Sequence, residues 1–116
     1  MPEEQDIISW SSLEGMEKTM GAAAAQTLAK KLLGFLEEKV AELEKNFAAD
    51  DADSTEACLH KLASNAAALG ALRLSKTARD MERDCVAGQW GSVKERKDAV
   101  LDIARLSLAA LKERLS

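Results

Sequence analysis

The stretch that decides the fold is residues 28–47, LAKKLLGFLEEKVAELEKNF. Its apolar side chains recur every three or four positions, and charged residues fill most of the gaps between them. The apolar stripe consists of Leu28, Leu32, Leu36, Val40, Leu43 and Phe47. This spacing is typical of an amphipathic helix that buries one face, whereas a strand would alternate every second residue. The pattern predicts one long helix over about 22–48.

The rest of the chain has the same character. Alanine and leucine are abundant, and the single proline, Pro2, lies at the very start, so good helix formers are common and helix breakers are few. Apolar periodicity predicts further helices over about 11–20, 54–69, 72–87 and 91–115. An acidic stretch before the second of these offers Asp53, paired with Glu56, or Ser54 as the N-cap. Short turns between long helices predict an all-α fold. We expect an antiparallel up-down-up-down four-helix bundle with a short extra N-terminal helix, forming a single domain over 1–116.

Composition excludes several classes of function. The formal net charge of −4 argues against a nucleic-acid binder, which needs a cationic surface. No apolar run approaches the roughly 20 residues that span a bilayer, and the acidic first residues do not resemble a secretory signal. Cys58 and Cys85 fall on apolar helix faces, where reduced cysteine packs as a small hydrophobic residue. We therefore expect a cytoplasmic protein, and a monomer because each helix has one apolar stripe.

The only histidine is His60, in the middle of the helix predicted over 54–69. With about 100° of rotation per residue, the core stripe of this helix lies 100–180° from His60; it comprises Leu59, Leu62, Ala66 and Leu69. The residues on the histidine's own face are Glu56, Ala63, Ser64 and Ala67. This arrangement predicts an imidazole in solvent with small neighbours. An exposed imidazole is largely neutral at cellular pH, which leaves a ring nitrogen free to act as a nucleophile.

A lone surface histidine on a helix usually has no function, but the sequence around this one is distinctive. Residues 60–72, HKLASNAAALGAL, resemble the signature of the histidine phosphotransfer (HPt) domains of bacterial phosphorelays. The matching residues are His60, Leu62, Ala66, Leu69, Gly70 and Leu72. The resemblance extends over nearly the whole chain. It includes the short leading helix, Phe35 near the middle of the long second helix, and the acidic turn before the histidine helix.

The resemblance implies that His60 exchanges a phosphoryl group with the aspartate of a response-regulator receiver domain. A histidine kinase or hybrid kinase is the other implied partner. The receiver is expected to supply Mg²⁺, so no cofactor or metal is expected on this chain. The outer ring nitrogen, Nε2, is the expected attachment point because it projects furthest from the helix. No glycine-rich nucleotide loop is present, so no ATP-dependent kinase activity is expected.

Two positions depart from the family pattern. The family's lysine three residues after the histidine, which helps to hold the phosphoryl group, is Ala63 here, and the following glycine is Ser64. The candidates for phosphoryl or docking support are Lys61, Ser64, Ala63, Ala67, Arg73 and Lys76. The missing lysine also supports an alternative function: a helical adaptor, or pseudo-phosphotransfer protein, that binds a receiver or kinase without transferring phosphate.

A basic stripe is predicted on the helix over 72–87. It consists of Arg73, Lys76, Arg79 and Arg83. These cations either are solvated and balanced by nearby carboxylates or attract the acidic pocket of a receiver domain.

Other chemistries have little support. One histidine and two separated cysteines are too few ligands for a zinc or haem site, and Cys58 is about 160° from His60 on the helix. The sequence contains no Ser-His-Asp arrangement and no dinucleotide-binding loop, which argues against a hydrolase or an oxidoreductase.

Overall fold

The computed structural model describes residues 7–116, and every regular element in that part of the chain is a helix. The helices are α2 (Ser11–Met20), α3 (Ala22–Ala48), α4 (Ala52–Ala68), α5 (Leu72–Val86), α6 (Trp90–Glu95) and α7 (Lys97–Leu115). The predicted all-α fold is confirmed. Residues 1–6, which belong to the domain predicted over 1–116, lie outside the described residues.

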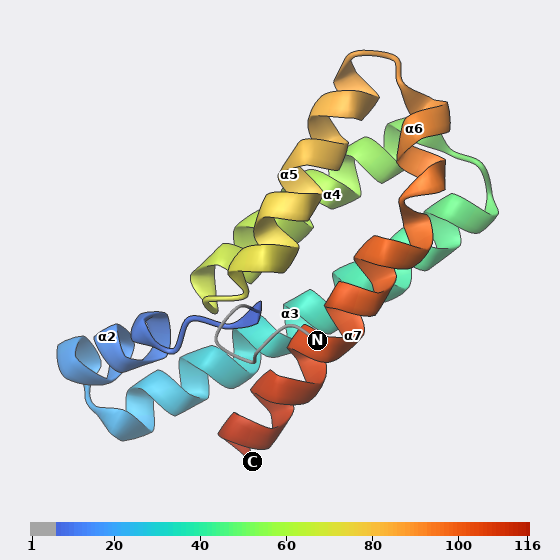
Figure 1. The fold of residues 1–116 in the computed structure, drawn as a ribbon. Coiled ribbons are helices and arrows are strands. Elements are labelled where there is room, and N and C mark those ends of the chain that lie inside the picture. Colours follow the sequence, from blue (N-terminus) through green and yellow to red (C-terminus); the bar gives the residue numbers. More distant parts are fainter. Residues whose placement is uncertain (1–6) are drawn as a thin grey trace.

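Four helices form the bundle. Around its core, α3 packs on α4, α4 on α5, α5 on α7, and α7 back on α3. Figure 1 shows α4 and α5 side by side, with α3 and α7 running along the other side of the bundle. The short helix α2 packs on the first half of α3, at the end of the molecule where the chain terminates. The order of the helices matches the predicted up-down-up-down arrangement with a short leading helix.

The core face of α3 differs from the predicted stripe in its first half. Leu36, Val40, Leu43 and Phe47 are buried as predicted. Before Leu36, however, the buried residues are Ala25, Ala29 and Leu33, whereas Leu28 and Leu32 are only partly buried. The reason is geometric: steps of four residues drift around a helix with 3.6 residues per turn, so a run spaced at four leaves the core face.

The start of α4 also differs from the prediction. The helix begins at Ala52 and its N-cap is Asp51, whose Oδ1 accepts a hydrogen bond from the backbone N–H of Ser54 at 3.0 Å. Asp53 therefore lies in the first turn of the helix and does not cap it. A run of three aspartates around one alanine offers several equivalent caps, so the sequence alone does not select among them.

The turn between α4 and α5 depends on Gly70. Its φ is +80°, a left-handed conformation that glycine adopts without steric cost. Its carbonyl accepts a hydrogen bond of 2.7 Å from the backbone N–H of Ser9. A Cβ at this position would collide with the backbone oxygen of Ser9. The glycine thus allows the segment before α2 to pack directly against the α4–α5 turn.

The closing helix, predicted to be continuous over 91–115, is divided at Arg96 into α6 and α7. The first piece is held against the end of α3 by what we call the aromatic junction: Phe47, Asp50, Trp90 and Lys94. The Trp90 ring stacks on Phe47 with centroids 5.9 Å apart, and its Nε1–H donates to Asp50 Oδ1 at 2.8 Å. Lys94 Nζ lies 3.2 Å from the same oxygen. These contacts tie α6 to the end of α3.

Both cysteines are free. Cys58 is buried and its Sγ donates to the Lys39 carbonyl at 3.2 Å, while Cys85 is partly buried against the core. Burial raises the pKa of each thiol to about 11. The prediction that both cysteines pack as core residues is confirmed for Cys58 and holds in part for Cys85. None of the helices within 7–116 is long and apolar enough to cross a membrane.

Candidate functional site

His60 lies at the middle of α4, on its solvent face. Its side chain is 63% exposed, whereas Leu59, Leu62 and Ala66 beneath it are fully buried. The predicted orientation of the imidazole is therefore confirmed. The core residues hold the helix in place while the ring stays accessible to another protein.

One ring nitrogen of His60 has a partner on the neighbouring helix. Nδ1 lies 2.8 Å from Oε2 of Glu82, a residue of α5 whose side chain is only 22% exposed. An ionised carboxylate accepts hydrogen bonds and donates none, so this contact assigns the ring proton to Nδ1. In that tautomer Nε2 has a free lone pair.

The sequence analysis did not single out Glu82 as a site residue. Its position could have been anticipated by counting residues from the turn between the two helices. His60 and Glu82 lie the same number of residues from Ala71, in two antiparallel helices. Such residues lie at the same level of a helical hairpin. Whether their side chains come into contact depends on how each helix is rotated about its own axis, which is set by the packing of the two helices.

The packing of α4 on α5 is close because the contact surface is made of small residues. Ala63, Ala66 and Ala78 are fully buried, and Ser75 Oγ donates to the backbone carbonyl of Ala63 at 2.9 Å. We call this contact surface the α4–α5 seam. A side chain that bonds directly to the opposite backbone fixes the register of the two helices, and so holds Glu82 against His60.

Ala63 was predicted to lie on the exposed face around His60, and this prediction is wrong. Ala63 is fully buried. It lies about 60° around α4 from His60, and that rotation is toward α5, which covers it. Ala63 therefore supports the seam and is not available to contact a phosphoryl group or a partner.

The other predicted residues on α4 separate into two groups. Ser64 is exposed and Ala67 partly buried, both on the histidine's side; Ser64 Oγ donates to the backbone carbonyl of His60 at 3.3 Å, and not to the ring. Lys61 is exposed toward α3, where its charge helps to lower the pKa of Glu42, an effect due mainly to the hydrogen bond from Lys39. The structure thus brings Ser64 and Ala67 beside the imidazole and directs Lys61 away from it.

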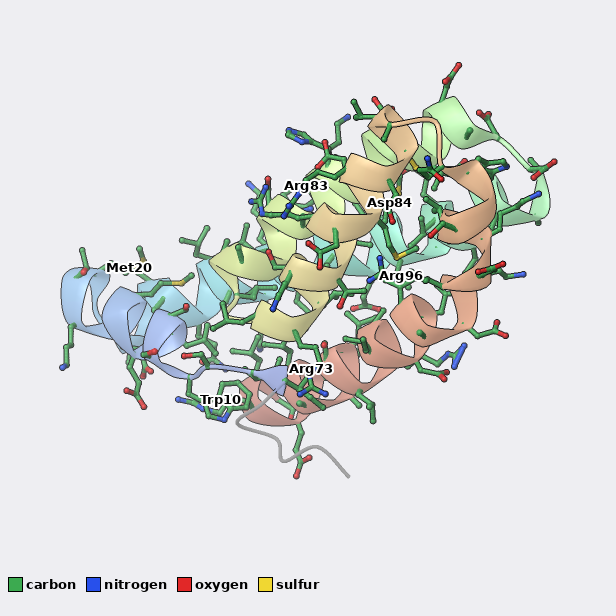
Figure 2. All side chains as sticks on the ribbon, turned by 45° about the horizontal axis from the view of Figure 1, so that its top comes forward. Trp10, Met20, Arg73, Arg83, Asp84 and Arg96 are labelled. Atoms are coloured by element: carbon green, nitrogen blue, oxygen red, sulfur yellow. The ribbon has the colours of Figure 1, made fainter. Side chains whose placement is uncertain are left out.

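The cations of α5 are spread over the helix and do not form one cluster. Arg73 and Lys76 are exposed. Figure 2 shows Arg73 and Arg83 toward opposite ends of the helix. Arg83 lies 3.1 Å from Asp80 on its own helix. The four cations predicted as one basic stripe are therefore spread along α5, with Arg73 and Arg83 toward opposite ends of the helix.

Within residues 7–116, no three or more His, Cys, Asp or Glu side chains are placed so that they could jointly hold a metal ion.

Comparison with known proteins gives the site its context. The sequence model of the Hpt domain matches residues 28–115. The chain belongs to the Hpt domain family. It is accordingly a histidine phosphotransfer protein of the kind used in two-component phosphorelays, whose members typically interact with kinases and response regulators. No curated protein sequence matches the chain.

A solved structure with the same Hpt fold is the crystal structure of histidine-containing phosphotransfer protein B (HptB) from Pseudomonas aeruginosa PAO1. The two structures superpose with a TM-score of 0.71 at 17% sequence identity, over 93% of this chain and 96% of the other. At this identity the likeness concerns the fold.

Proposed function

We propose that His60 is the phosphoacceptor of this Hpt protein, and that its Nε2 exchanges a phosphoryl group with the aspartate of response-regulator receiver domains. A histidine kinase or hybrid kinase is the other proposed partner. The observation that supports this most strongly is the hydrogen bond between Nδ1 and Glu82, which selects the neutral tautomer with its proton on Nδ1 and its Nε2 lone pair free, on an imidazole that is mostly exposed.

The proposed transfer is an in-line displacement. The Nε2 lone pair of His60 attacks the phosphorus of the receiver's phosphoaspartate, a P–N bond forms, and the P–O bond breaks so that the aspartate carboxylate leaves with the electron pair. The ring, which keeps its Nδ1 proton, gains positive charge. Glu82 accepts that proton's hydrogen bond and stabilises the charge. The reverse step returns the phosphoryl group by the same atoms.

The surroundings of His60 suit contact with another protein. Ser64 and Ala67 are too short to obstruct the ring. On α5, Leu72 and Val86 are large apolar side chains that are 51% and 69% exposed, and exposed apolar side chains are typical of docking surfaces. Arg73 and Lys76 are exposed cations that would attract the acidic pocket of a receiver. Mg²⁺ is expected on the receiver.

The alternative is an adaptor that binds a receiver without accepting its phosphoryl group. The observation that favours it is Ala63, the buried residue at the position where the family has a lysine.

Phosphotransfer assays distinguish the two. Receiver domains are charged with radiolabelled acetyl phosphate and mixed with the wild-type protein and with His60→Gln. We expect an acid-labile, alkali-stable label on the wild type within minutes and none on His60→Gln, with unchanged helical circular dichroism in both. A wild-type protein that binds a charged receiver but stays unlabelled would establish the adaptor.

The proposal also includes location and oligomeric state. The two unpaired cysteines support a cytoplasmic location, since disulfides are rare there. The burial of core residues from every long helix within one bundle supports a monomer, which sedimentation would test.

A further inference from the structure

We propose that Arg79 of α5 binds the phosphoryl group on His60 and supplies the positive charge that the family's lysine would supply at position 63. This inference rests on the proposed function, because it concerns the phosphorylated form of His60. It assigns a role to a cation whose place beside the histidine becomes evident only from the register of α4 and α5.

The register is fixed by two contacts across the α4–α5 seam. Ser75 Oγ bonds to the Ala63 carbonyl at 2.9 Å, and Glu82 Oε2 lies 2.8 Å from His60 Nδ1. Arg79 lies between Ser75 and Glu82 on α5. In an antiparallel pair, it is therefore level with the segment of α4 between His60 and Ala63.

Rotation around α5 places Arg79 closest of the four basic residues to the side that faces α4. Ser75 and Glu82 mark that side. Relative to Glu82, Arg79 is turned by about 60° toward solvent. The corresponding turns are about 100° for Arg83, 120° for Lys76 and 180° for Arg73. Arg79 thus lies at the solvent edge of the seam, on the same open face as the imidazole.

The Arg79 side chain is also available to bind a ligand. It is exposed, and within 7–116 it has no ion pair, in contrast to Arg83, which lies 3.1 Å from Asp80. Packed helices have axes about 8–10 Å apart, a gap that an arginine side chain spans. On the side of the imidazole that faces α5, the α4 side chains of Ala63 and Ala67 are short.

The charges at the site create a need for this cation. A phosphoryl group brings about −1.5 to −2 charges, and Glu82 already places a carboxylate against the ring. The imidazolium formed on transfer offsets one charge only. Arginine's planar fork of donors suits phosphoryl oxygens, so Arg79 neutralises the excess.

The test uses phosphoramidate, a small phosphodonor that phosphorylates histidine without a receiver, and follows phosphohistidine by ³¹P NMR. The variants are Arg79→Ala and Arg79→Lys, with Arg83→Ala as a control of equal charge change on the same helix. For Arg79→Ala we expect phosphorylation about tenfold slower, the factor of one charge-assisted hydrogen bond. We also expect a higher pKa for the phosphoryl group in the ³¹P titration. Arg79→Lys should restore part of both effects, and Arg83→Ala should change neither.

Two results would overturn the inference. One is an equal effect of Arg79→Ala and Arg83→Ala, which would show that only total charge matters. The other is slower transfer from a charged receiver with an unchanged phosphoramidate rate and ³¹P titration, which would make Arg79 a docking residue. A wild-type protein that neither donor phosphorylates would instead refute the proposed function.

Discussion

Two regions of this Hpt protein join helices in opposite ways. In the α4–α5 seam, small residues such as Ala63 and Ala78 let the helices approach until Ser75 reaches the opposite backbone. In the aromatic junction, the large rings of Phe47 and Trp90 fill the space between α3 and α6, and Asp50 ties the indole in place. The seam sets positions precisely enough for a hydrogen bond to His60, whereas the junction contributes apolar area.

Because the two regions join helices differently, we expect the junction to affect the stability of the fold and the seam to affect phosphotransfer. Changes in the junction should lower the free energy of unfolding and leave the imidazole's environment intact. Changes on the open edge of the seam should alter transfer and leave stability intact. Variants in each of the two regions test this separation.

The largest effect on stability is expected at the end of the seam, for Gly70→Ala. The left-handed φ costs about 1–2 kcal/mol for a residue with a Cβ, and displacing the Ser9 backbone adds to this, so we expect a total loss of about 3 kcal/mol. The matched control is Gly88→Ala. Gly88 has a φ of +78° but no atom near a Cβ, so it should lose only about 1 kcal/mol. Urea unfolding measures both; equal losses would show that the Ser9 contact is unimportant.

In the aromatic junction, Trp90→Ala should lower the free energy of unfolding by about 2 kcal/mol. The ring is only partly buried, so the loss is smaller than for a core tryptophan. Trp90→Phe keeps a ring against Phe47 and should recover most of it. Neither variant should change the rate at which phosphoramidate phosphorylates His60 in folded protein. A slower rate would mean that the junction also positions the histidine.

On the open edge of the seam, Glu82→Gln should slow phosphorylation of His60 about tenfold, because the ring loses a charged acceptor for its Nδ1 proton. The Tm should stay nearly constant. Asp80→Asn, on the same helix, serves as the control and should keep the wild-type rate. An unchanged rate in Glu82→Gln would show that solvent orients the ring equally well.

The smallest effect concerns acid stability at the start of α4. Hydrogen bonding from the Ser54 backbone N–H holds the pKa of Asp51 below its ordinary value. Asp51 therefore contributes stability above its ordinary pKa, and this contribution is lost as the pH falls below about 4. Asp51→Asn keeps a capping oxygen that does not titrate, so its Tm should fall less on acidification. Thermal melts between pH 3 and 7 measure the difference; parallel curves would exclude a role for Asp51 in acid stability.

Much of this fold could be predicted from the sequence, because helix periodicity is a local property. The stripe ending in Val40, Leu43 and Phe47 and the exposure of His60 both followed from rotation along a single helix. What failed depended on contacts between helices. Ala63 was expected in solvent because rotation alone does not say that α5 covers that side.

For the site too, the features that depend on one helix could be predicted, and those that depend on contacts between helices could not. His60 is unique in the sequence, and its neighbours on α4 follow from spacing. Glu82 and Arg79 belong to a different helix, and their relation to His60 depends on the register fixed by Ser75. The break at Arg96 was not predicted for a similar reason. It separates α7 from α6, whose Trp90 stacks on Phe47, a residue remote in sequence.

The state of the two thiols has a practical consequence for a signalling protein. Oxidants and alkylating agents react with thiolates, and with a pKa of about 11 Cys58 and Cys85 stay almost wholly protonated in neutral solution. Hydrogen peroxide should therefore leave both sulfurs unmodified at doses that inactivate proteins with exposed thiolates. The rate at which phosphoramidate phosphorylates His60 should be the same before and after such a peroxide treatment.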